Sequence, residues 1–383
     1  MRLGRWLALP AAFFFACSTA LASPELPEIN ADAAIVIEAS TGRVVYEKNA
    51  DERRYPASLT KMMTAILALE NGKPDEMVLI SRRAVDEEYH QLSYAVGDVL
   101  TLSEALEGML LCSENGLAQA VAENVAPTYS DFIRQMNRRA AELGAGDTQF
   151  VNASGMPDDS HYSTARDMVR IARWGWMLPE FRRLVSEGEG VIEWEKPYGR
   201  QLPTENTNEL LGEYEGMCGI KTGWTSQAGG CMAAAAMRDG LTLLAIVMHS
   251  DSVKARFDDT RALLDYGFEA LQAEEGPAGA RLGRRLPVRQ GRAGELMVCP
   301  ACDISWPLFE GEKKSGYSLR YELPEYLEAP LRKGQKVGEI VVSYEGSEVG
   351  RIDMLTADKV EKATGFFSAA AELCGTIYST LFC

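Results

Sequence analysis

The chain has 383 residues, 46% of them hydrophobic, and is long enough for two folded domains. It carries 55 acidic and 39 basic side chains, which gives a formal net charge of −16 at pH 7. This acidity argues against nucleic acid as a partner, because nucleic-acid-binding proteins need cationic patches. It also argues against attachment to a membrane by charge attraction.

The first 22 residues have the pattern of a secretory signal peptide. Two arginines precede an apolar run at 7–17, and a small-residue cleavage site follows at 20–22. We favour cleavage after residue 22 over lipoprotein processing at Cys17, because the phenylalanines before that cysteine are a poor context for it. The protein is therefore expected to be exported, with residues 1–22 removed.

Export makes disulfides possible. Of the eight cysteines, one lies in the predicted leader, so an odd number remains and at least one is unpaired within the monomer. Cys299 and Cys302 form an isolated C-x-x-C, for which a labile disulfide or two reduced thiols is a better interpretation than zinc. Cys218 and Cys231 flank a predicted hairpin, where we expect two buried free thiols.

Residues 23–275 predict one domain. Strands near both of its ends, with helices between them, indicate a sheet covered by helices rather than a series of βαβ units. The helix that follows the first hairpin has Pro56 at its start and Gly72 at its end. The expected elements are a hairpin at 33–49, a helix at 55–72, largely helical structure at 103–176, strands at 216–237 and 241–250, and a closing helix at 255–272.

The end of the chain predicts a second, smaller domain. A change in composition at 273–285 predicts a linker, and the short strands beyond it predict an all-β domain at 280–356. In residues 357–383, apolar side chains recur at helical spacing and predict an amphipathic helix. This segment is short for a membrane span and carries Glu372, so we expect it to lie at a membrane surface. The alternative is a terminal helix packed on its own domain.

Ser58 and Lys61 lie in the first turn of the helix predicted at 55–72. A serine hydroxyl is a weak nucleophile that needs a base, and a buried lysine with a lowered pKa can accept its proton. The helix N-terminus would also direct the Ser58 N–H toward a developing oxyanion. The alternative is a helix cap followed by a solvated lysine, which S-x-x-K alone does not exclude because its residues are common.

Two further motifs follow in order. Ser113 and Asn115 form S-x-N after an apolar helix, and Lys221, Thr222 and Gly223 form K-T-G on a predicted strand. The ordered triplet S-x-x-K, S-x-N and K-T-G is that of penicillin-binding proteins and serine β-lactamases. In an exported protein, the three motifs together favour a nucleophile and its base.

The chain resembles the D-alanyl-D-alanine carboxypeptidases, the low-molecular-mass penicillin-binding proteins of the type-five group. Besides the triplet, the resemblance includes P-A-S-L-T-K at 56–61, F-x-N-x-x-G and H-x-S-T-A-x-D-M within 150–168, the run R-F-D-D-T-R that starts with Arg256, and K-G-Q-K-V-G-E at 333–339. The resemblance covers essentially the whole mature chain. It implies an α/β (α+β) fold: a β-lactamase/transpeptidase-like domain with an antiparallel sheet covered by helices, a small all-β domain and an amphipathic anchor.

The resemblance also implies catalytic roles. Ser58 would attack the carbonyl between the last two D-alanines of a peptidoglycan stem peptide, or the ring of a β-lactam antibiotic, and Lys61 would be the acylation base. Ser113 would relay the proton to the leaving amine, and Asn115 would order the site and bind a substrate amide. The backbone N–H groups of Ser58 and Trp224 would form the oxyanion hole, and water would then hydrolyse the acyl-enzyme.

A substrate that ends in a free carboxylate needs cations, and Lys221 and Arg256 can supply them in an otherwise acidic protein. The resemblance places Thr222 with Arg256 at this carboxylate, with Gly223 beside them. It places His161 near the substrate, although a local structural hydrogen bond is the favoured interpretation of that residue. No metal or other cofactor is required, and the three histidines show no ligand spacing.

Two residues depart from the pattern of the resembled family. Trp224 follows K-T-G where some relatives have a histidine. Since only its backbone N–H is needed, we expect an altered substrate preference or deacylation rate and no loss of catalysis. Glu114 fills the variable position of S-x-N, and its charge is expected near the cleft.

The expected activity is that of a serine D,D-carboxypeptidase, held peripherally at the periplasmic face of the inner membrane. A serine β-lactamase is the nearest alternative, but the common class needs a glutamate that activates the deacylating water, and Glu205 and Asn208 lack the E-x-x-x-N spacing. A D,D-endopeptidase would use the same residues. A catalytically idle wall-binding protein is disfavoured because all the proposed nucleophile, base and oxyanion positions are filled.

Overall fold

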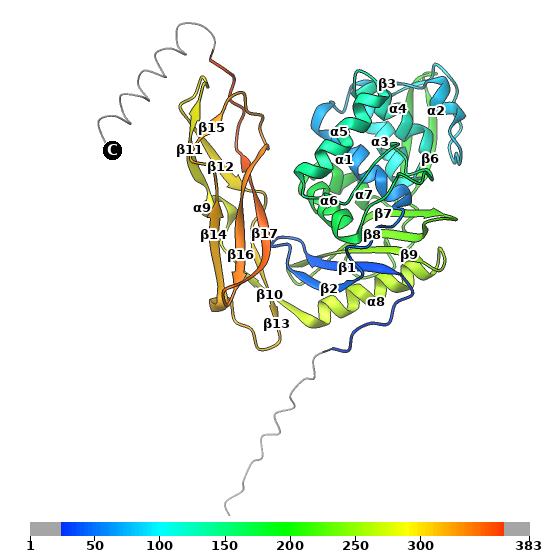
Figure 1. Cartoon of the computed structure of the whole chain (residues 1–383). Coiled ribbons are helices and arrows are strands. Elements are labelled where there is room, and N and C mark those ends of the chain that lie inside the picture. Colours follow the sequence, from blue (N-terminus) through cyan, green and yellow to red (C-terminus); the bar gives the residue numbers. More distant parts are fainter. Residues whose placement is uncertain (1–23, 364–383) are drawn as a thin grey trace, which may run out of the picture.

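The computed structural model describes residues 24–363 (Figure 1). The predicted signal peptide at 1–22 lies outside the described residues, as does the part of the predicted C-terminal helix at 364–383. The predicted start of that helix, residues 357–363, is not helical, and residues 360 and 362 instead form β-bridges with residues 331 and 291. No helix within the described range is long and apolar enough to cross a membrane.

A five-stranded antiparallel sheet forms the centre of the larger domain, with helix α8 on one face and the other helices on the opposite face (Figure 1). Its strands, in spatial order, are β2 (Val44–Lys48), β1 (Ala33–Glu38), β9 (Leu241–Ser250), β8 (Gly229–Arg238) and β7 (Met217–Thr225). Ile35 and Ile37 pack among the helices, whereas Ala34 and Val36 pack toward α8 (Ala255–Ala270). This alternation is the period of two of a strand that is buried on both faces.

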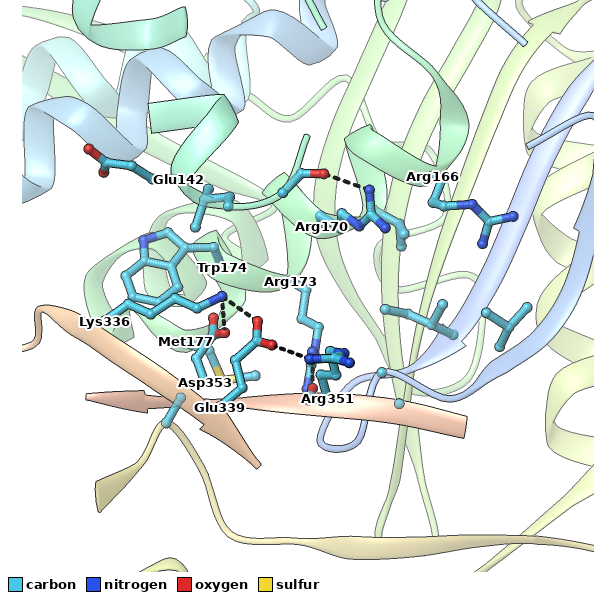
Figure 2. A pocket seen from close by; sticks show the side chains of 18 of the residues that line it. Glu142, Arg166, Arg170, Arg173, Trp174, Met177, Lys336, Glu339, Arg351 and Asp353 are labelled. Atoms are coloured by element: carbon cyan, nitrogen blue, oxygen red, sulfur yellow. Dashed lines mark hydrogen bonds and ion pairs between the residues drawn. The ribbon is translucent and has the colours of Figure 1, made fainter. Parts of the chain in front are cut away.

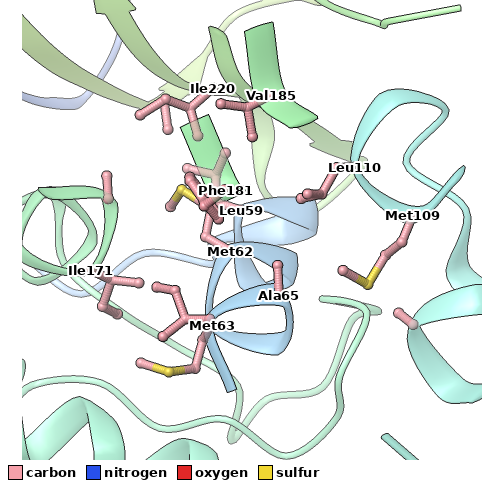
Figure 3. Packing of buried hydrophobic residues seen from close by; sticks show 14 of the residues in the cluster. Leu59, Met62, Met63, Ala65, Met109, Leu110, Ile171, Phe181, Val185 and Ile220 are labelled. Carbon is pink, nitrogen blue, oxygen red and sulfur yellow. The ribbon is translucent and has the colours of Figure 1, made fainter. Parts of the chain in front are cut away.

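Helix α1 (Lys61–Asn71) runs through the middle of the helical layer and is buried on every side over its first turns. Figure 3 shows Met62, Met63 and Ala65 of α1 packed among apolar side chains from neighbouring helices and β7. The surrounding helices are α2 (Arg82–Asp86), α3 (Leu102–Leu111), α4 (Asn115–Val125), α5 (Tyr129–Glu142), α6 (Ala165–Met177) and α7 (Pro179–Ser186). Because α1 cannot shift without opening cavities in this core, its N-terminal end is held in a fixed position.

A second, four-stranded antiparallel sheet was not predicted. It consists of β3 (Met77–Leu79), β4 (Val99–Thr101), β5 (Glu189–Lys196) and β6 (Arg200–Glu205), in that order. Two of its strands are only three residues long, too short for a periodic signal. In β5, buried Ile192 and Trp194 alternate with exposed Val191, Glu193 and Glu195, an alternation that was readable in the sequence.

The smaller domain is all-β and has its own apolar core. Its six-stranded sheet has the order β14 (Tyr317–Glu322), β16 (Lys336–Tyr344), β17 (Ser347–Thr356), β12 (Glu295–Pro300), β11 (Arg284–Arg289) and β15 (Leu327–Glu328). The segment predicted as a linker is ordered instead. It contains β10 (Leu271–Glu275), which pairs with β13 (Ser305–Phe309), and the short helix α9 (Gly279–Leu282).

Charged side chains join the two domains around a cavity of about 560 Å³. Figure 2 shows the arginines of α6 on one wall and ion-paired side chains of β16 and β17 on the other. Arg173 donates to the Arg351 carbonyl at 2.8 Å, and Arg43, at the β1–β2 turn, pairs with Glu312 at 2.7 Å. These charge-assisted contacts link the β domain to the side of the larger domain that carries the β1–β2 turn.

Candidate active site

Ser58 lies in a single 3₁₀ turn (Ala57–Thr60) that leads directly into α1, whose first residue is Lys61. The predicted helix at 55–72 therefore begins with a tighter turn than expected. The Lys61 Nζ atom lies 2.8 Å from Ser58 Oγ, and Lys61 is fully buried, whereas Ser58 is partly exposed. The lysine is thus not the solvated side chain of the alternative interpretation.

Lys61 has two further partners, Asn115 Oδ1 at 2.7 Å and the Ser154 carbonyl at 2.8 Å. Both are acceptors, so a neutral amine gives its two protons to them and directs its free electron pair toward the Ser58 hydroxyl. Burial lowers the pKa of Lys61 to about 7, although the negative charges of Glu114 and Glu87 oppose the shift. The arrangement can therefore remove a proton from Ser58 near neutral pH.

The S-x-N motif forms the turn between α3 and α4. Ser113 is partly exposed and has a positive φ of 61°, and Asn115 is the first residue of α4. Glu114 was expected to place its charge near the cleft, and its charge does raise the pKa of Lys61 against the effect of burial. The Glu114 side chain is fully buried and accepts hydrogen bonds from the loop that follows α2.

The K-T-G motif lies on β7, the edge strand of the main sheet beside Ser58. A Cβ atom at Gly223 would lie 3.0 Å from the Ser58 nitrogen, closer than ordinary packing allows. Thr222 Oγ1 lies 2.6 Å from Thr207 Oγ1, and the Trp224 side chain is 51% exposed. A strand with no side chain at this point can bring its backbone next to the nucleophile.

Lys221 on β7 and Arg256 on α8 are two buried basic side chains. Lys221 Nζ donates to the Thr222 carbonyl at 3.1 Å, and Arg256 Nη1 donates to the Gly223 carbonyl at 2.9 Å. Burial lowers the pKa of Lys221 well below its usual value, and the charges of Lys61 and Arg256 lower it further. The Arg256 Nε is buried without a hydrogen-bond partner. A bound carboxylate would stabilise the charged forms of both side chains and so raise their pKa values.

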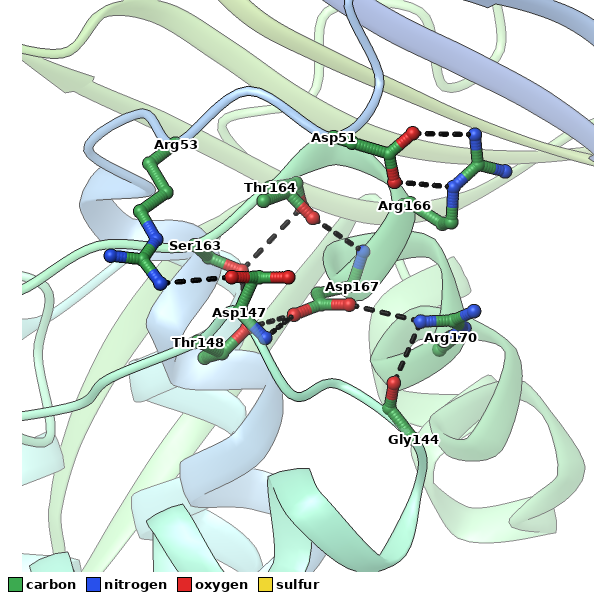
Figure 4. Close-up of polar contacts among 10 residues, drawn as sticks. All are labelled: Asp51, Arg53, Gly144, Asp147, Thr148, Ser163, Thr164, Arg166, Asp167 and Arg170. Atoms are coloured by element: carbon green, nitrogen blue, oxygen red, sulfur yellow. Dashed lines mark hydrogen bonds and ion pairs between the residues drawn. The ribbon is translucent and has the colours of Figure 1, made fainter.

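The loop between α5 and α6 forms another wall of the site. Gly155 in this loop has a φ of +88°, and a Cβ there would lie 1.8 Å from the Ala57 carbonyl oxygen, so only glycine fits. This close passage brings the neighbouring Ser154 carbonyl to Lys61. In Figure 4, Asp167 accepts from the Asp147 N–H and the Thr148 hydroxyl, which fastens the loop to the start of α6.

His161 was expected near the substrate, with a structural hydrogen bond as the favoured interpretation. Its side chain is buried, Nδ1 accepts from the Val151 N–H at 3.3 Å, and Nε2 lies 2.8 Å from Thr60 Oγ1. Burial lowers the pKa of His161 to about 4, so the ring is neutral and donates from Nε2. With both nitrogens engaged, it supports the Ser58 turn from behind and has no free polar group for a substrate.

The described thiols are unpaired. Cys112 and Cys231 are buried, and Cys218, Cys299 and Cys302 are partly exposed. Cys231 lies opposite Gly223 across β7 and β8, whereas Cys218 lies at the far end of β7, so these two do not meet. Within residues 24–363, no group of three or more His, Cys, Asp or Glu side chains is placed to hold a metal ion.

Fold and site together define a serine acyl-transfer enzyme of the penicillin-recognising kind, in which a lysine is the base that accepts the proton of the nucleophilic serine. The family model of D-alanyl-D-alanine carboxypeptidase matches residues 19–252, and that of the penicillin-binding protein 5 C-terminal domain matches residues 278–362. The chain belongs to the D-alanyl-D-alanine carboxypeptidase family.

Individual relatives can be aligned with most of the chain. The D-alanyl-D-alanine carboxypeptidase DacF of Bacillus subtilis is 28% identical over 88% of this chain and 87% of its own length. The crystal structure of penicillin-binding protein 5 from Haemophilus influenzae has a TM-score of 0.65 at 26% identity, and covers 88% of this chain and 100% of its own. A Streptomyces K15 DD-transpeptidase structure, 32% identical with a TM-score of 0.61, covers 63% of this chain and 99% of its own.

Proposed function

We propose that the chain is a serine D,D-carboxypeptidase that removes the terminal D-alanine from peptidoglycan stem peptides, and that penicillins acylate the same serine. The observation that carries this proposal is the contact of Ser58 Oγ with Lys61 Nζ at 2.8 Å, in a site where the other two partners of Lys61 are acceptors. Family membership along both domains supports the substrate class.

In this mechanism, Lys61 takes the Ser58 proton while Oγ bonds to the carbonyl carbon of the penultimate D-alanine. The N–H groups of Ser58 and Trp224 stabilise the oxyanion. The proton passes through Ser113 to the nitrogen of the departing D-alanine as the peptide bond breaks. Water then attacks the ester, releases the shortened peptide and returns the proton to Ser58.

The terminal carboxylate would bind beside β7. Thr222 offers a hydroxyl, and Lys221 and Arg256 are buried basic side chains whose desolvation an anionic group would offset. Asn115 is held to Lys61 and contributes mainly to the order of the site. His161 would act only as a support of the Ser58 turn.

The alternative activities differ in the fate of the acyl-enzyme. A β-lactamase of the common class needs a carboxylate that activates the deacylating water. Glu205, the glutamate considered for this role, is exposed at the end of β6. This favours a peptidase that penicillin traps. A D,D-endopeptidase would cleave the crosslink between two stem peptides and release no free D-alanine.

The test mixes the mature protein with a synthetic peptide that ends in D-Ala-D-Ala and, separately, with benzylpenicillin. We expect release of one D-alanine and a long-lived penicilloyl adduct on Ser58, both seen by mass spectrometry. Rapid release of penicilloic acid with an intact peptide would replace the proposal with a β-lactamase. A crosslinked dimeric muropeptide is offered as a third substrate, and its cleavage with the peptide left intact would replace the proposal with an endopeptidase.

Peripheral attachment to the periplasmic face of the inner membrane is part of the same proposal. It rests on the amphipathic pattern of residues 364–383 and on the charge of the surface where the described chain ends. There, residues 360–362 pair with residues 331 and 291. The exposed basic residues around this point outnumber the acidic ones: Arg289, Arg292, Arg332, Lys333, Lys359 and Lys362 against Glu328, Asp358 and Glu361.

This surface would attract anionic lipid headgroups despite the acidity of the whole chain. Reversing two of its charges with Arg332→Glu/Lys333→Glu is expected to weaken binding of the full-length mature protein to vesicles containing phosphatidylglycerol by about tenfold or more. Binding to neutral vesicles should not change. The matched control, Lys313→Glu/Lys314→Glu, alters exposed lysines in another loop of the β domain. An equal loss of vesicle binding in both variants would contradict the proposal that this surface contacts the membrane.

A further inference from the structure

The loop that follows α2 is fastened to the S-x-N turn by one buried carboxylate. Glu114 Oε1 accepts from Tyr94 Oη at 2.8 Å and lies 2.5 Å from His90 Nδ1. Glu114 Oε2 accepts from the N–H groups of Gln91 at 2.8 Å and Leu92 at 3.1 Å. A fully buried carboxylate with four partners holds its loop much more firmly than one apolar contact could.

The neighbouring residue of the motif fits the same loop. A Cβ at Gly116 would lie 2.1 Å from Tyr94 Oη and 2.2 Å from the Ala84 carbonyl oxygen, so the loop and α4 approach each other without room for a side chain. Asn115, between these two residues, donates from Nδ2 to the Glu88 carbonyl at 2.8 Å. Three successive residues of one turn therefore contact one loop.

The Glu88 carbonyl decides which way the Asn115 amide points. It accepts only from Nδ2, so Oδ1 is left to face Lys61 Nζ at 2.7 Å. A flipped amide would put an NH₂ group against the amine and remove one of its acceptors. The Lys61 electron pair would then no longer be directed at Ser58.

We propose that Glu114 is a positioning residue for the acylation base. By holding the loop after α2 it fixes the Glu88 carbonyl, through it the Asn115 amide, and through that amide the free electron pair of Lys61. This inference rests on the proposed role of Lys61 as the base.

The charge of Glu114 provides a readout that a purely structural role would not move. Two charged groups shift the pKa of Lys61: Glu114 on the turn and Glu87 at the end of α2. A third titratable group, Lys221 on β7, has its own pKa lowered by the charge of Lys61. The two glutamates raise the pKa of Lys61 against the effect of burial. The acylation rate is expected to rise with pH as Lys61 loses its proton (the acid limb) and then to level off at a plateau. Removing the charge of Glu114 should therefore shift the acid limb to lower pH, while the disturbed geometry lowers the rate at the plateau.

The experiment measures acylation of the mature protein by a chromogenic cephalosporin across pH, separating the reversible dissociation constant from the limiting rate. Glu114→Gln is expected to lower the limiting rate by about a hundredfold with little change in the dissociation constant, and to move the acid limb downward. Tyr94→Phe, which removes one donor but keeps the ring, is expected to lower the limiting rate several-fold. If Glu114→Gln fails to fold, Tyr94→Phe still tests the proposal.

The matched control is Glu38→Gln. Glu38 is also a buried carboxylate that accepts from two backbone N–H groups and two hydroxyls, those of Ser40 and Thr41, but it lies in the β1–β2 turn. Its loss should lower the melting temperature and leave acylation unchanged. A wild-type rate and acid limb in Glu114→Gln, or a wild-type rate in Tyr94→Phe, would overturn the inference. Absence of acylation in the wild-type protein would overturn the proposed function instead.

Discussion

Replacing Ser58 with alanine is expected to abolish both covalent capture of benzylpenicillin and release of D-alanine, a loss of about six orders of magnitude in rate. Within the described residues, Ser58 is the one serine whose hydroxyl contacts Lys61 Nζ. Its side chain is partly exposed, and the substitution removes a single oxygen, so the fold should survive. The measurement is the intact mass of the protein after incubation, together with its melting temperature.

Ser186→Ala is the control for this experiment. Ser186 ends α7, is exposed, and donates only to the Arg183 carbonyl. This variant should gain the same mass increment as the wild type. A penicilloyl adduct on Ser58→Ala would show that another residue is the nucleophile, and the site described around Lys61 would then need reassignment.

The sequence predicted the elements that carry strong periodicity. The hairpin of β1 and β2, the strands β7 to β9 and the closing helix α8 were expected, because apolar runs there are long and end at glycine or polar residues. The sheet of β3 to β6 was not, since two of its strands are very short. The segment at 273–285 has the composition of a linker, but its first residues belong to β10. That strand is ordered because it pairs with β13, which comes later in the chain. Composition carries no information about such a distant partner.

The candidate site was predictable where side-chain chemistry forms a motif. Ser58 and Lys61 do meet, and Asn115 joins them. The third partner of Lys61 is the Ser154 carbonyl, which any residue type could supply, so no sequence pattern marks it. The burial of Glu114 and its hydrogen-bond partners were not predicted, because S-x-N leaves its middle residue free. Its direction depends on how a loop distant in the chain packs, and local sequence does not encode that packing.

Lys61 is expected to give acylation an acid limb centred near pH 7. Burial lowers the pKa of Lys61 to about 7, and only the neutral amine can accept the Ser58 proton. The rate should therefore rise with pH through 7 and level off above it, and at pH 5 it should be roughly a hundredfold below the plateau. The measurement is the second-order rate constant for penicillin acylation between pH 5 and pH 9.

Lys61→Arg keeps a positive charge but cannot lose its proton, so it should be inactive across the whole range. The surface variant Lys254→Arg should keep both the plateau and the limb. Lys221 makes the comparison decisive, because burial also lowers the pKa of this second lysine. Lys221 Nζ donates to the Thr222 carbonyl, whereas Lys61 Nζ contacts Ser58 Oγ, so geometry assigns the limb to Lys61. An active Lys61→Arg with an unchanged limb would transfer the role of base to Lys221.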